Sequence, residues 1–472
     1  MNLTILKSHR AATSAKSTPL RRRVAGQKAF VPWRLGGNFF TGVLVFFSAS
    51  LLFAQAEPSR PNTSFGMIDT VIVVGNDKTK EAIIIREMTL RPGMEATTEA
   101  MEWDRSRIYS IGLFTRVDLL VVPLDNRNML IVDVSERWYI IPLPLFGFRD
   151  GDPKKPYYGA GLLHNNFQGL NQKLFGSVIF GYNPSLALSF SDPWIDRENN
   201  LFLSSGLSFS RIRNRSAIIA GTNNFDEQHY DVNATLGKRF TLFQSVSLNV
   251  GLHMVEVTDH RPGTTVSPTG IDRYVYAGIS YAYDSRNLRD YTTEGMYVGT
   301  YITKYGFGET ALSFTRIGAD FRRFTPLPLN FTLANRVHGS LVSGSFIPTY
   351  TRTYFGYGER IRGYFKNVFE GENITGASVE LRWPLLKPRT VIFSAVPIPQ
   401  EFSVWRIGIS LALFADAGAT WFRGDKLSLD MFASGYGGGI AFLLPYDIVM
   451  RTEYAWNDRG SGQFVIDFRS SF

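Results

Sequence analysis

The final ten residues of the chain alternate between two kinds of side chain. In the segment 463–472 the even positions read Phe, Ile, Phe, Ser and Phe, and the odd positions after Gln463 read Val, Asp, Arg and Ser. A period of two places these sets on opposite faces of a β-strand. One face is apolar and the other is charged, so we expect a strand that separates two different solvents. Lipid on one side and water on the other would satisfy both faces.

The region 138–472 repeats this pattern. Helical periodicity is absent from Trp138 onward, and short alternating segments are separated by clusters of Asn, Asp, Gly and Pro. In 378–383, for example, apolar residues at odd positions alternate with Ser, Glu and Arg at even positions. About sixteen strands of about ten residues are predicted, an even number that is typical of antiparallel bacterial barrels. They span 138–148, 156–168, 172–183, 184–192, 199–212, 227–239, 243–258, 271–284, 294–304, 309–322, 329–343, 373–384, 405–417, 433–443, 446–457 and 462–472.

We therefore predict that 138–472 is an outer-membrane β-barrel of mostly β structure. A Phe at the end of the last strand, here Phe472, is typical of bacterial outer-membrane barrels. Aromatic residues make up 14% of the chain and glycines number 43, as expected for aromatic girdles and tight turns. A soluble β-sandwich is the alternative. It would not explain the terminal Phe, the N-terminal leader or so many consecutive strands.

The segment 1–56 is predicted to be a signal peptide. A basic region precedes an apolar run at 39–54, and Ala54-Gln55-Ala56 offers a small-x-small cleavage site. A membrane anchor, which needs ~20 apolar residues, and an organellar transit peptide are the alternatives. Eight of the 50 Lys and Arg residues lie in this segment without any Asp or Glu, which leaves 42 basic against 41 acidic side chains elsewhere. This near-neutral remainder argues against a nucleic-acid partner.

The next part of the chain is predicted to be a linker at 57–66, rich in Pro, Ser and Asn, and a compact α+β domain at 67–137. The expected order is strand, helix, helix, strand, strand. These elements are expected at 68–74, 80–88, 97–111, 117–122 and 129–134. Such a domain leaves one edge of its sheet open, and an open edge can accept an extended peptide.

No motif for catalysis, cofactor binding or metal binding stands out. The chain has no Cys, and its six His residues are scattered without metal-ligand spacing. It contains no H-E-x-x-H, no G-x-S-x-G and no phosphate-binding G-x4-G-K-[ST] sequence. The Gly-Tyr-Gly-Gly-Gly run at 435–439 is better explained by glycine packing inside a barrel strand than by a phosphate loop. We expect a protein that is not an enzyme and that uses no cofactor.

Two long connections, 344–372 and 385–404, are expected on the extracellular side, where barrel loops tend to carry function. The first contains Gly-Tyr-Gly-Glu-Arg-Ile-Arg-Gly-Tyr at 356–364. Its Arg-Gly-Tyr tripeptide resembles the tip motif of the sixth extracellular loop in the outer-membrane assembly-factor superfamily. That superfamily, which includes the bacterial surface antigen family, comprises BamA-like insertases, TamA-like factors and two-partner secretion transporters.

The rest of the chain extends this resemblance. The 67–137 domain is similar to the periplasmic POTRA domain of the superfamily, and its characteristic residues fall in POTRA order: Gly75, Pro92, Gly93, Gly112 and Phe114. The segments 165–169, 191–194, 284–286 and 414–418 are similar to the family's barrel strands. Each motif alone is weak, but their order is specific.

The resemblance implies that four loop residues fold into the barrel lumen: Ile361, Arg362, Gly363 and Tyr364. An arginine there is costly unless carboxylates accept its fork of donors. Glu380 and Asp416 lie on the polar faces of their strands by parity, and the resemblance implies the same pairing. The glycine would let the loop backbone pass close to the barrel wall. An ordinary surface-loop arginine is the alternative.

A second predicted feature is a weak seam. Pro142 and Pro144 fall in the first candidate strand, and residues two apart direct their backbone groups to the same side, so both prolines remove donors from one edge. If that edge faces the last strand, with its Phe468 and Phe472, the closing seam lacks hydrogen bonds. Such a seam could open sideways and offer its edge to a client strand. The alternative is that 138–148 is a linker that enters the barrel.

The resemblance implies an outer-membrane assembly factor. It would take unfolded polypeptide from the periplasm through one POTRA domain and insert it into the outer membrane through the seam. Its partners would be outer-membrane lipids, unfolded barrel or secreted clients, and periplasmic chaperones or accessory lipoproteins. The principal insertases carry several POTRA domains, so accessory docking is in question. A dedicated secretion transporter of the same superfamily is the close alternative, although such transporters typically carry a plug helix and two POTRA domains. A passive porin, which would lack both the POTRA domain and the loop motif, is the third reading.

Overall fold

The computed structural model describes residues 62–149, 153–216, 218–219, 225–288, 291–307, 312–392, 404–444 and 448–467. The predicted signal peptide and the seam residues Phe468 and Phe472 lie outside this part of the chain. Within the described residues, no helix is long and apolar enough to cross a membrane.

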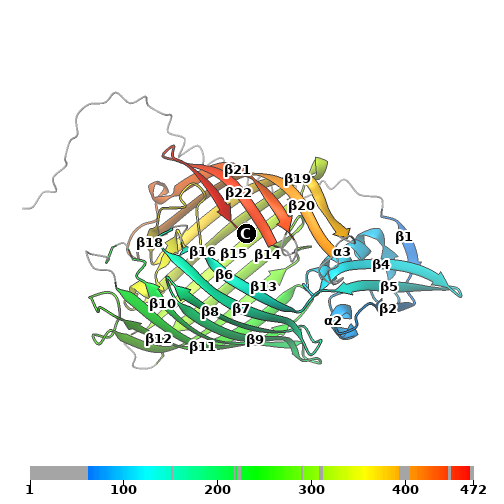
Figure 1. The fold of residues 1–472 in the computed structure, drawn as a ribbon, viewed down its shortest axis with the longest axis horizontal. Helices are drawn as coiled ribbons and strands as arrows, with labels where there is room; N and C mark the ends of the chain where they lie inside the picture. The colour runs from blue at the N-terminus through cyan, green and yellow to red at the C-terminus, as the bar shows by residue number, and fades with distance from the viewer. Residues whose placement is uncertain are drawn as a thin grey trace, which may run out of the picture. The chain divides into compact units, whose positions relative to one another are not determined.

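The small domain is an α+β unit (Figure 1). Its elements are β1 (Ser64–Met67), β2 (Thr70–Val74), α2 (Glu81–Ile85), β3 (Glu95–Thr97), α3 (Thr98–Tyr109), β4 (Phe114–Leu124) and β5 (Arg127–Glu136). The main sheet has the order β2-β5-β4, with β2 parallel and β4 antiparallel to β5. The predicted order of strand, helix, helix, strand and strand is confirmed, with one addition, the short sheet of β1 and β3.

Local sequence signals explain where several of these elements begin and end. The Thr97 hydroxyl accepts a hydrogen bond from the Ala100 backbone N–H at 3.3 Å and so caps α3. Asp125 and Asn126 both have positive φ in the two-residue turn between β4 and β5, which is typical of tight hairpins. Residues 64–66, expected in the linker, belong instead to β1. A strand of four residues shows too little alternation to be recognised from sequence.

Apolar side chains from the sheet and both helices form the core of the small domain. Ile84, Ile108, Leu113, Phe114 and Leu130 are fully buried. Burial of these side chains is the main source of stability for a domain of this size. The core therefore uses the face of the sheet that the helices cover, and the outer edge of β2 has no strand neighbour among the described residues.

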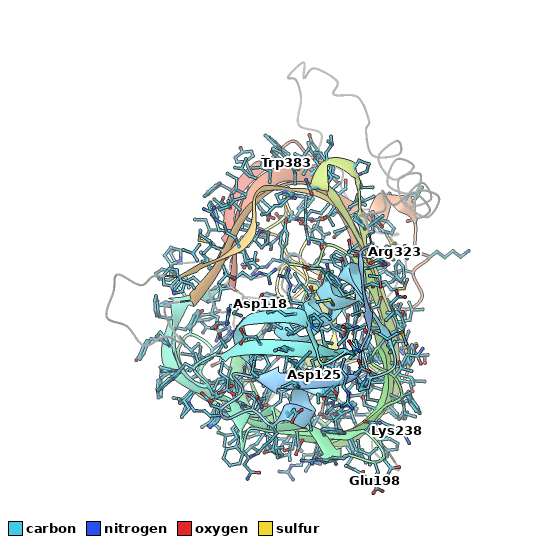
Figure 2. All side chains as sticks on the ribbon, turned by 90° about the vertical axis from the view of Figure 1, so that its right-hand side faces the viewer. Asp118, Asp125, Glu198, Lys238, Arg323 and Trp383 are labelled. Carbon is cyan, nitrogen blue, oxygen red and sulfur yellow. The ribbon has the colours of Figure 1, made fainter. Side chains whose placement is uncertain are left out.

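Sixteen antiparallel strands form one sheet, which is the wall of a β-barrel (Figures 1 and 2). The strands are β6 (Ile140–Phe148), β7 (Pro156–Phe167), β8 (Gln172–Gly181), β9 (Ser185–Asp196), β10 (Leu201–Arg213), β11 (Asp226–Arg239), β12 (Gln244–Val257), β13 (Ile271–Asp284), β14 (Gly295–Tyr305), β15 (Phe314–Pro326), β16 (Thr332–Gly344), β19 (Asn373–Ile392), β20 (Val404–Trp421), β21 (Ala433–Leu444), β22 (Ile448–Asn457) and β23 (Gly462–Asp467). Each pairs with the next barrel strand, and β6 and β23 stand at the two ends of the order. The predicted barrel of about sixteen strands is confirmed.

Side chains alternate between the outer and the inner face of the barrel wall. Along β23, Phe464 and Ile466 are exposed, whereas Gln463, Val465 and Asp467 are partly covered and face the interior. Figure 2 shows Lys238 and Trp383 on the outer surface of the wall. An apolar exterior around a polar interior is the pattern expected for strands in lipid.

The prediction of a long connection at 385–404 is wrong. β19 continues to Ile392 and β20 begins only at Val404. The prolines near the predicted break are absorbed because the pairing of β19 with β20 shifts register on both sides of Leu386. Because β19 runs away from the 345–372 connection, Ile392 at its far end and Val404 at the start of β20 belong to the opposite end of the barrel. We call the end that carries 345–372 the loop end and the opposite end the turn end.

Candidate functional site

The connection 345–372 folds against the inner faces of the last barrel strands. It contains a short hairpin of β17 (Thr353–Phe355) and β18 (Phe369–Gly371). Two of its side chains, Ile361 and Tyr364, are buried and belong to one apolar cluster with residues of β17, β19 and β21. The loop therefore carries a small apolar core of its own into the barrel interior.

Arg362 is held by two carboxylates on neighbouring strands. Its Nε and Nη2 atoms donate to the two oxygens of Asp416, each at 2.7 Å, and its backbone N–H donates to the same carboxylate at 3.0 Å. Nη1 donates to Glu380 Oε2 at 2.6 Å. Asp416 lies in β20 and Glu380 in β19. The fork of the guanidinium thus matches one carboxylate in the bidentate geometry that arginine favours.

The side chains of these ion pairs are largely buried. The side chains of Glu380 and Asp416 are each 4% exposed, and that of Arg362 is 14% exposed. The guanidinium also lies over the ring of Phe414, 3.7 Å from its centroid. Buried charges of this kind need all their partners, because removal of one leaves the others uncompensated at a cost of about 3–5 kcal/mol.

A third carboxylate, Glu453, completes the site and was missed by sequence reasoning. Its Oε1 lies 3.4 Å from Arg362 Nη1 and accepts a hydrogen bond from Arg451 Nη1 at 2.8 Å. Arg382 Nε donates to Glu380 at 2.6 Å. Arg451 and Glu453 have the same parity in β22, so the alternation rule could have placed both in the lumen. We refer to these three arginines and the three carboxylates as the loop-anchor network.

Glycines in the loop and in the wall let the loop tip lie close to the barrel strands. A Cβ atom at Gly363, whose φ is +95°, would lie 2.8 Å from the carbonyl oxygen of Trp456 in β22. A Cβ atom at Gly435 in β21 would lie 1.8 Å from the carbonyl oxygen of Arg362. Gly418 in β20 faces the side chains of Phe355 and Ile361 in the same way. The loop backbone can therefore reach the wall only where the wall has no side chain.

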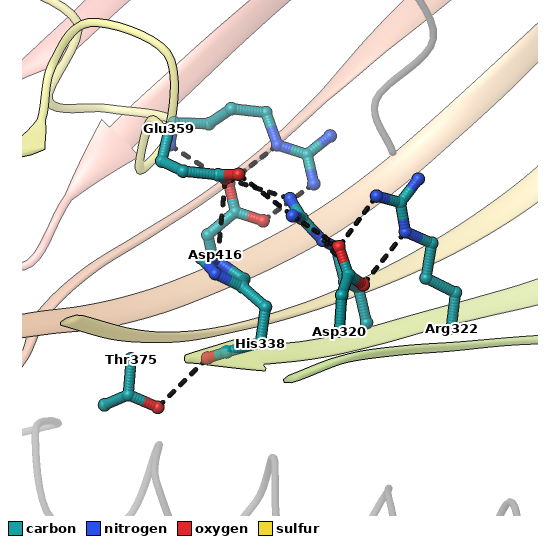
Figure 3. Close-up of polar contacts among 8 residues, drawn as sticks. Asp320, Arg322, His338, Glu359, Thr375 and Asp416 are labelled. Carbon is teal, nitrogen blue, oxygen red and sulfur yellow. Dashed lines mark hydrogen bonds and ion pairs between the residues drawn. The ribbon is translucent and has the colours of Figure 1, made fainter. Parts of the chain in front are cut away.

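A second ion cluster fixes the loop to the wall beside the network (Figure 3). Glu359 accepts two hydrogen bonds of 2.9 Å from Arg336 in β16. Arg336 also contacts Asp320 in β15 at 2.8 Å, and Asp320 is held in turn by Arg322 at 2.7 Å. Sequence reasoning did not find this cluster, since its members are spread over two strands and a loop. It ties a second point of the loop to the strands β15 and β16.

The hydrogen bonds of β6 show which edge of the strand the backbone groups of its two prolines face. Asn165 N–H donates to the Tyr139 carbonyl at 2.8 Å, and Arg149 N–H donates to the Lys155 carbonyl at 2.9 Å. In an unshifted antiparallel ladder, these bonds mean that odd residues of β6 direct their backbone groups toward β7 and even residues direct them away. Pro142 and Pro144 are even, so their missing donors fall on the edge away from β7.

The comparisons with known proteins decide the family. The model of the Omp85 superfamily domain matches residues 166–470. The chain belongs to the Omp85 superfamily. A POTRA model, described as a surface antigen variable number repeat, matches residues 67–137. This chain is therefore an outer-membrane Omp85 barrel preceded by a POTRA domain, and the resemblance seen in the sequence is confirmed.

Solved structures with the Omp85 fold resemble the chain. It is similar to BamA from Haemophilus ducreyi lacking POTRA domains 1–3, with 15% identity and a TM-score of 0.50 over 87% of this chain and 84% of that chain. It is also similar to CdiB from Acinetobacter baumannii, with 14% identity, a TM-score of 0.49 and coverage of 85% and 73%. For CdiB from Escherichia coli the values are 11%, 0.49, 94% and 99%. At these identities the likeness concerns the fold alone. No curated protein sequence matches the chain.

The POTRA residues singled out from the sequence lie at turns and in the core. Gly75, Gly93 and Gly112 all have positive φ, and a Cβ atom at Gly75 would lie 2.0 Å from the Val134 carbonyl. Phe114 is fully buried. Pro92 lies before Gly93 in the turn that leads to β3. These residues therefore shape the turns and fill the core of the POTRA domain.

Glu87 links the POTRA domain of this Omp85 protein to a barrel strand. It accepts hydrogen bonds from Arg107 at 3.1 Å and from Arg239 of β11 at 2.8 Å. Both arginines also donate to the Leu242 carbonyl in the turn after β11. Burial opposes ionisation of Glu87, but the hydrogen bonds and positive charge of the arginines, Arg239 foremost, outweigh it and lower its pKa to about 2. Sequence reasoning had no signal for this contact.

Within the described part of this Omp85 chain, no group of three or more His, Asp or Glu side chains is arranged to hold a metal ion. The arginines and carboxylates of the loop-anchor network instead satisfy each other. The arrangement holds the loop against the barrel wall.

Proposed function

We propose that this Omp85 protein takes unfolded polypeptide through its POTRA domain and inserts it into the outer membrane through the seam between β6 and β23. The barrel would lie in the outer membrane of a Gram-negative-type cell, with the POTRA domain in the periplasm and the loop end outside. The protein would act without catalysis, by pairing with strand edges and by lowering the barrier to insertion.

The observation that carries this proposal is the direction of the backbone at Pro142 and Pro144. Both prolines lack an N–H on the edge of β6 that lies away from β7. A barrel that had only to stay closed would gain from full hydrogen bonding at its last junction. A junction short of donors is easier to separate, and a separated edge can pair with a strand of a client.

The POTRA sheet supports the first step of this function. β2 has one strand neighbour, β5, among the described residues, so its other edge can accept an extended peptide. The sheet also exposes apolar side chains, including Ile72, Val74 and Leu120. Unfolded barrel proteins and secreted proteins are extended and partly apolar, so both features suit such clients.

The loop-anchor network argues against the porin alternative. Arg362 and its carboxylates hold 345–372 inside the barrel, whereas a porin depends on an open lumen. We expect weak and irregular conductance from the purified protein in planar lipid bilayers. Steady, large conductance would favour a porin.

The test of the proposal is depletion of the protein, followed by quantitative proteomics of the outer membrane and of the culture medium. Loss of many unrelated barrel proteins is expected for an insertase. Loss of one secreted or surface protein, with the barrels intact, would instead establish a dedicated secretion transporter of the same superfamily. Cross-linking at the POTRA domain in the same cells would identify chaperones or accessory lipoproteins that bind there.

A further inference from the structure

The loop tip contacts the terminal hairpin of the barrel directly. Asn457 Nδ2 at the end of β22 donates to the Gly363 carbonyl at 3.1 Å, and the Phe365 backbone N–H donates to Gln463 Oε1 at 2.8 Å. The Tyr364 hydroxyl donates to Asp458 in the turn between β22 and β23. Because Gln463 belongs to β23, the loop holds the last strand itself and not only its neighbours.

A series of charges reaches the other end of the described part of β23. Arg362 contacts Glu453, and Glu453 accepts a hydrogen bond from Arg451. Arg451 Nη2 lies 3.4 Å from Asp467 Oδ2. The loop arginine is thus linked to β23 through one carboxylate and one arginine of β22. Of the inward-facing polar side chains of β23, Gln463 bonds to the loop directly, and Asp467 contacts the loop-anchor network through Arg451.

These side-chain contacts matter because β23 stands at the end of the sheet. Its backbone pairs with β22 and, among the described residues, with no other strand. At the seam, β23 would face the edge of β6 that lacks two donors, so this junction is weaker than one between interior strands. Contacts to the inward-facing side chains of β23 therefore add to the β22–β23 pairing in keeping the strand in place.

We propose that Gln463 and Arg451 are positioning residues that couple the loop to the seam. When 361–365 is seated on the loop-anchor network, these two residues hold β23 against β22. When the loop leaves its seat, β23 loses the Phe365–Gln463 hydrogen bond directly. Glu453 also loses Arg362, so it no longer holds Arg451 in the position from which Arg451 contacts Asp467, and β23 becomes freer to move out of the seam. This inference rests on the proposed function, since it assigns a regulator to the seam through which clients would pass.

The test measures the mobility of β23 without any client. The full chain is reconstituted in phosphatidylethanolamine–phosphatidylglycerol vesicles, and amide hydrogen exchange of peptides that cover 462–467 is followed by mass spectrometry. Gln463→Ala, Arg451→Gln and Arg362→Ala are each expected to speed exchange there by about tenfold, which corresponds to about 1.4 kcal/mol. Val465→Ala, which alters the same inward face between the two contacts, is the matched control and should change exchange little.

The double variant Arg362→Ala/Arg451→Gln separates coupling from simple weakening. If the two residues act through one network, the double variant exchanges no faster than the more affected single variant. Multiplicative effects, or an Arg362→Ala variant that leaves β23 exchange unchanged, would overturn the proposal. Variants that fail to fold are recognised by loss of the heat-modifiable band shift in gels. Client insertion plays no part in this measurement. The coupling can therefore be present even if the proposed function is wrong, and the proposed function can hold even if the coupling is absent.

Discussion

The carbonyl oxygen of Arg362 lies directly against Gly435 of β21, where an added Cβ atom would be only 1.8 Å away. The nearest atom belongs to the backbone of the loop and not to the end of a flexible side chain. The position of the loop therefore depends on the lack of a side chain at Gly435 as much as on the charges around the guanidinium.

Replacing this glycine should unseat the loop without unfolding the barrel. Gly435→Ala is expected to displace 361–363 and to destabilise the seated state by about 1–3 kcal/mol, because overpacking forces backbone shifts. Faster protease cleavage in 356–364 is the measurement. Gly438→Ala, on the same strand, is the control, since its Cβ atom would meet the flexible side-chain end of Leu413 at 3.1 Å. Equal cleavage in both variants would contradict the role given to Gly435.

Removing the Arg362 guanidinium should destabilise the protein more than replacing it with an ammonium group. Arg362→Ala removes the bidentate partner of Asp416, while Glu380 keeps Arg382 and Glu453 keeps Arg451. The buried network then lacks one positive charge, and we expect a cost of about 3–5 kcal/mol of stability. Arg362→Lys keeps the charge but loses the bidentate fork, so its loss should be smaller. The temperature at which the folded band disappears in gels reports both effects.

Arg360→Ala serves as the control for these variants. Arg360 is in the same loop, donates to the Tyr357 carbonyl at 3.1 Å and lies over the ring of Phe365, 4.2 Å from its centroid. A melting temperature for Arg362→Ala equal to that of Arg360→Ala would show that the buried network contributes little.

Acid should weaken the contact made by Glu87. Its pKa is lowered from an ordinary value of 4.5 to about 2 in the folded protein, so the folded state favours the ionised form. The resulting stabilisation is present above pH 4.5 and is lost as the pH falls toward 2. A shift of this size corresponds to about 3 kcal/mol.

Urea unfolding of the protein in detergent, followed by Trp fluorescence at several pH values, measures this effect. The wild-type midpoint should fall between pH 4.5 and pH 2 by more than that of Glu87→Gln, which has no charge to lose. Parallel pH curves for the two proteins would mean that Glu87 contributes nothing to the acid response.

A disulfide across the seam should stop client insertion. The chain contains no Cys, so one pair introduced between 138–141 and 468–472 has no competing thiols. We expect oxidised protein in vesicles to lose the ability to speed folding of a urea-unfolded barrel protein, and reduction to restore it. A cysteine pair at Phe146 and Tyr158, which lie opposite each other in β6 and β7, controls for the chemistry. Full activity in the locked seam would rule out lateral opening.

Period-two patterning was sufficient to predict the barrel, because lipid and water impose opposite demands on the two faces of every strand. The same parity put Glu380 and Asp416 on the inward face, and the structure has both in contact with Arg362. Sequence patterning failed to predict the end of the strand before 385–404, because prolines that seem to end a strand can be accommodated at β-bulges.

Other parts of the site depend on where the loop lies, and no local pattern carries that information. Glu453 was within reach of the parity rule, but Gly435 gains its meaning only from the loop backbone above it. The Glu359–Arg336–Asp320 cluster joins a loop and two strands that are distant in sequence. Long-range placement of this kind emerges only when the chain is folded.

The two prolines of β6 also determine how firmly any strand can be kept at that edge. Their carbonyl oxygens still point away from β7, so an incoming strand can donate hydrogen bonds to residues 142 and 144 but receives none from them. Each missing bond forgoes about 0.5–1.5 kcal/mol. The edge of β6 is thus rich in acceptors and poor in donors, a composition that permits capture of a strand while keeping its departure fast.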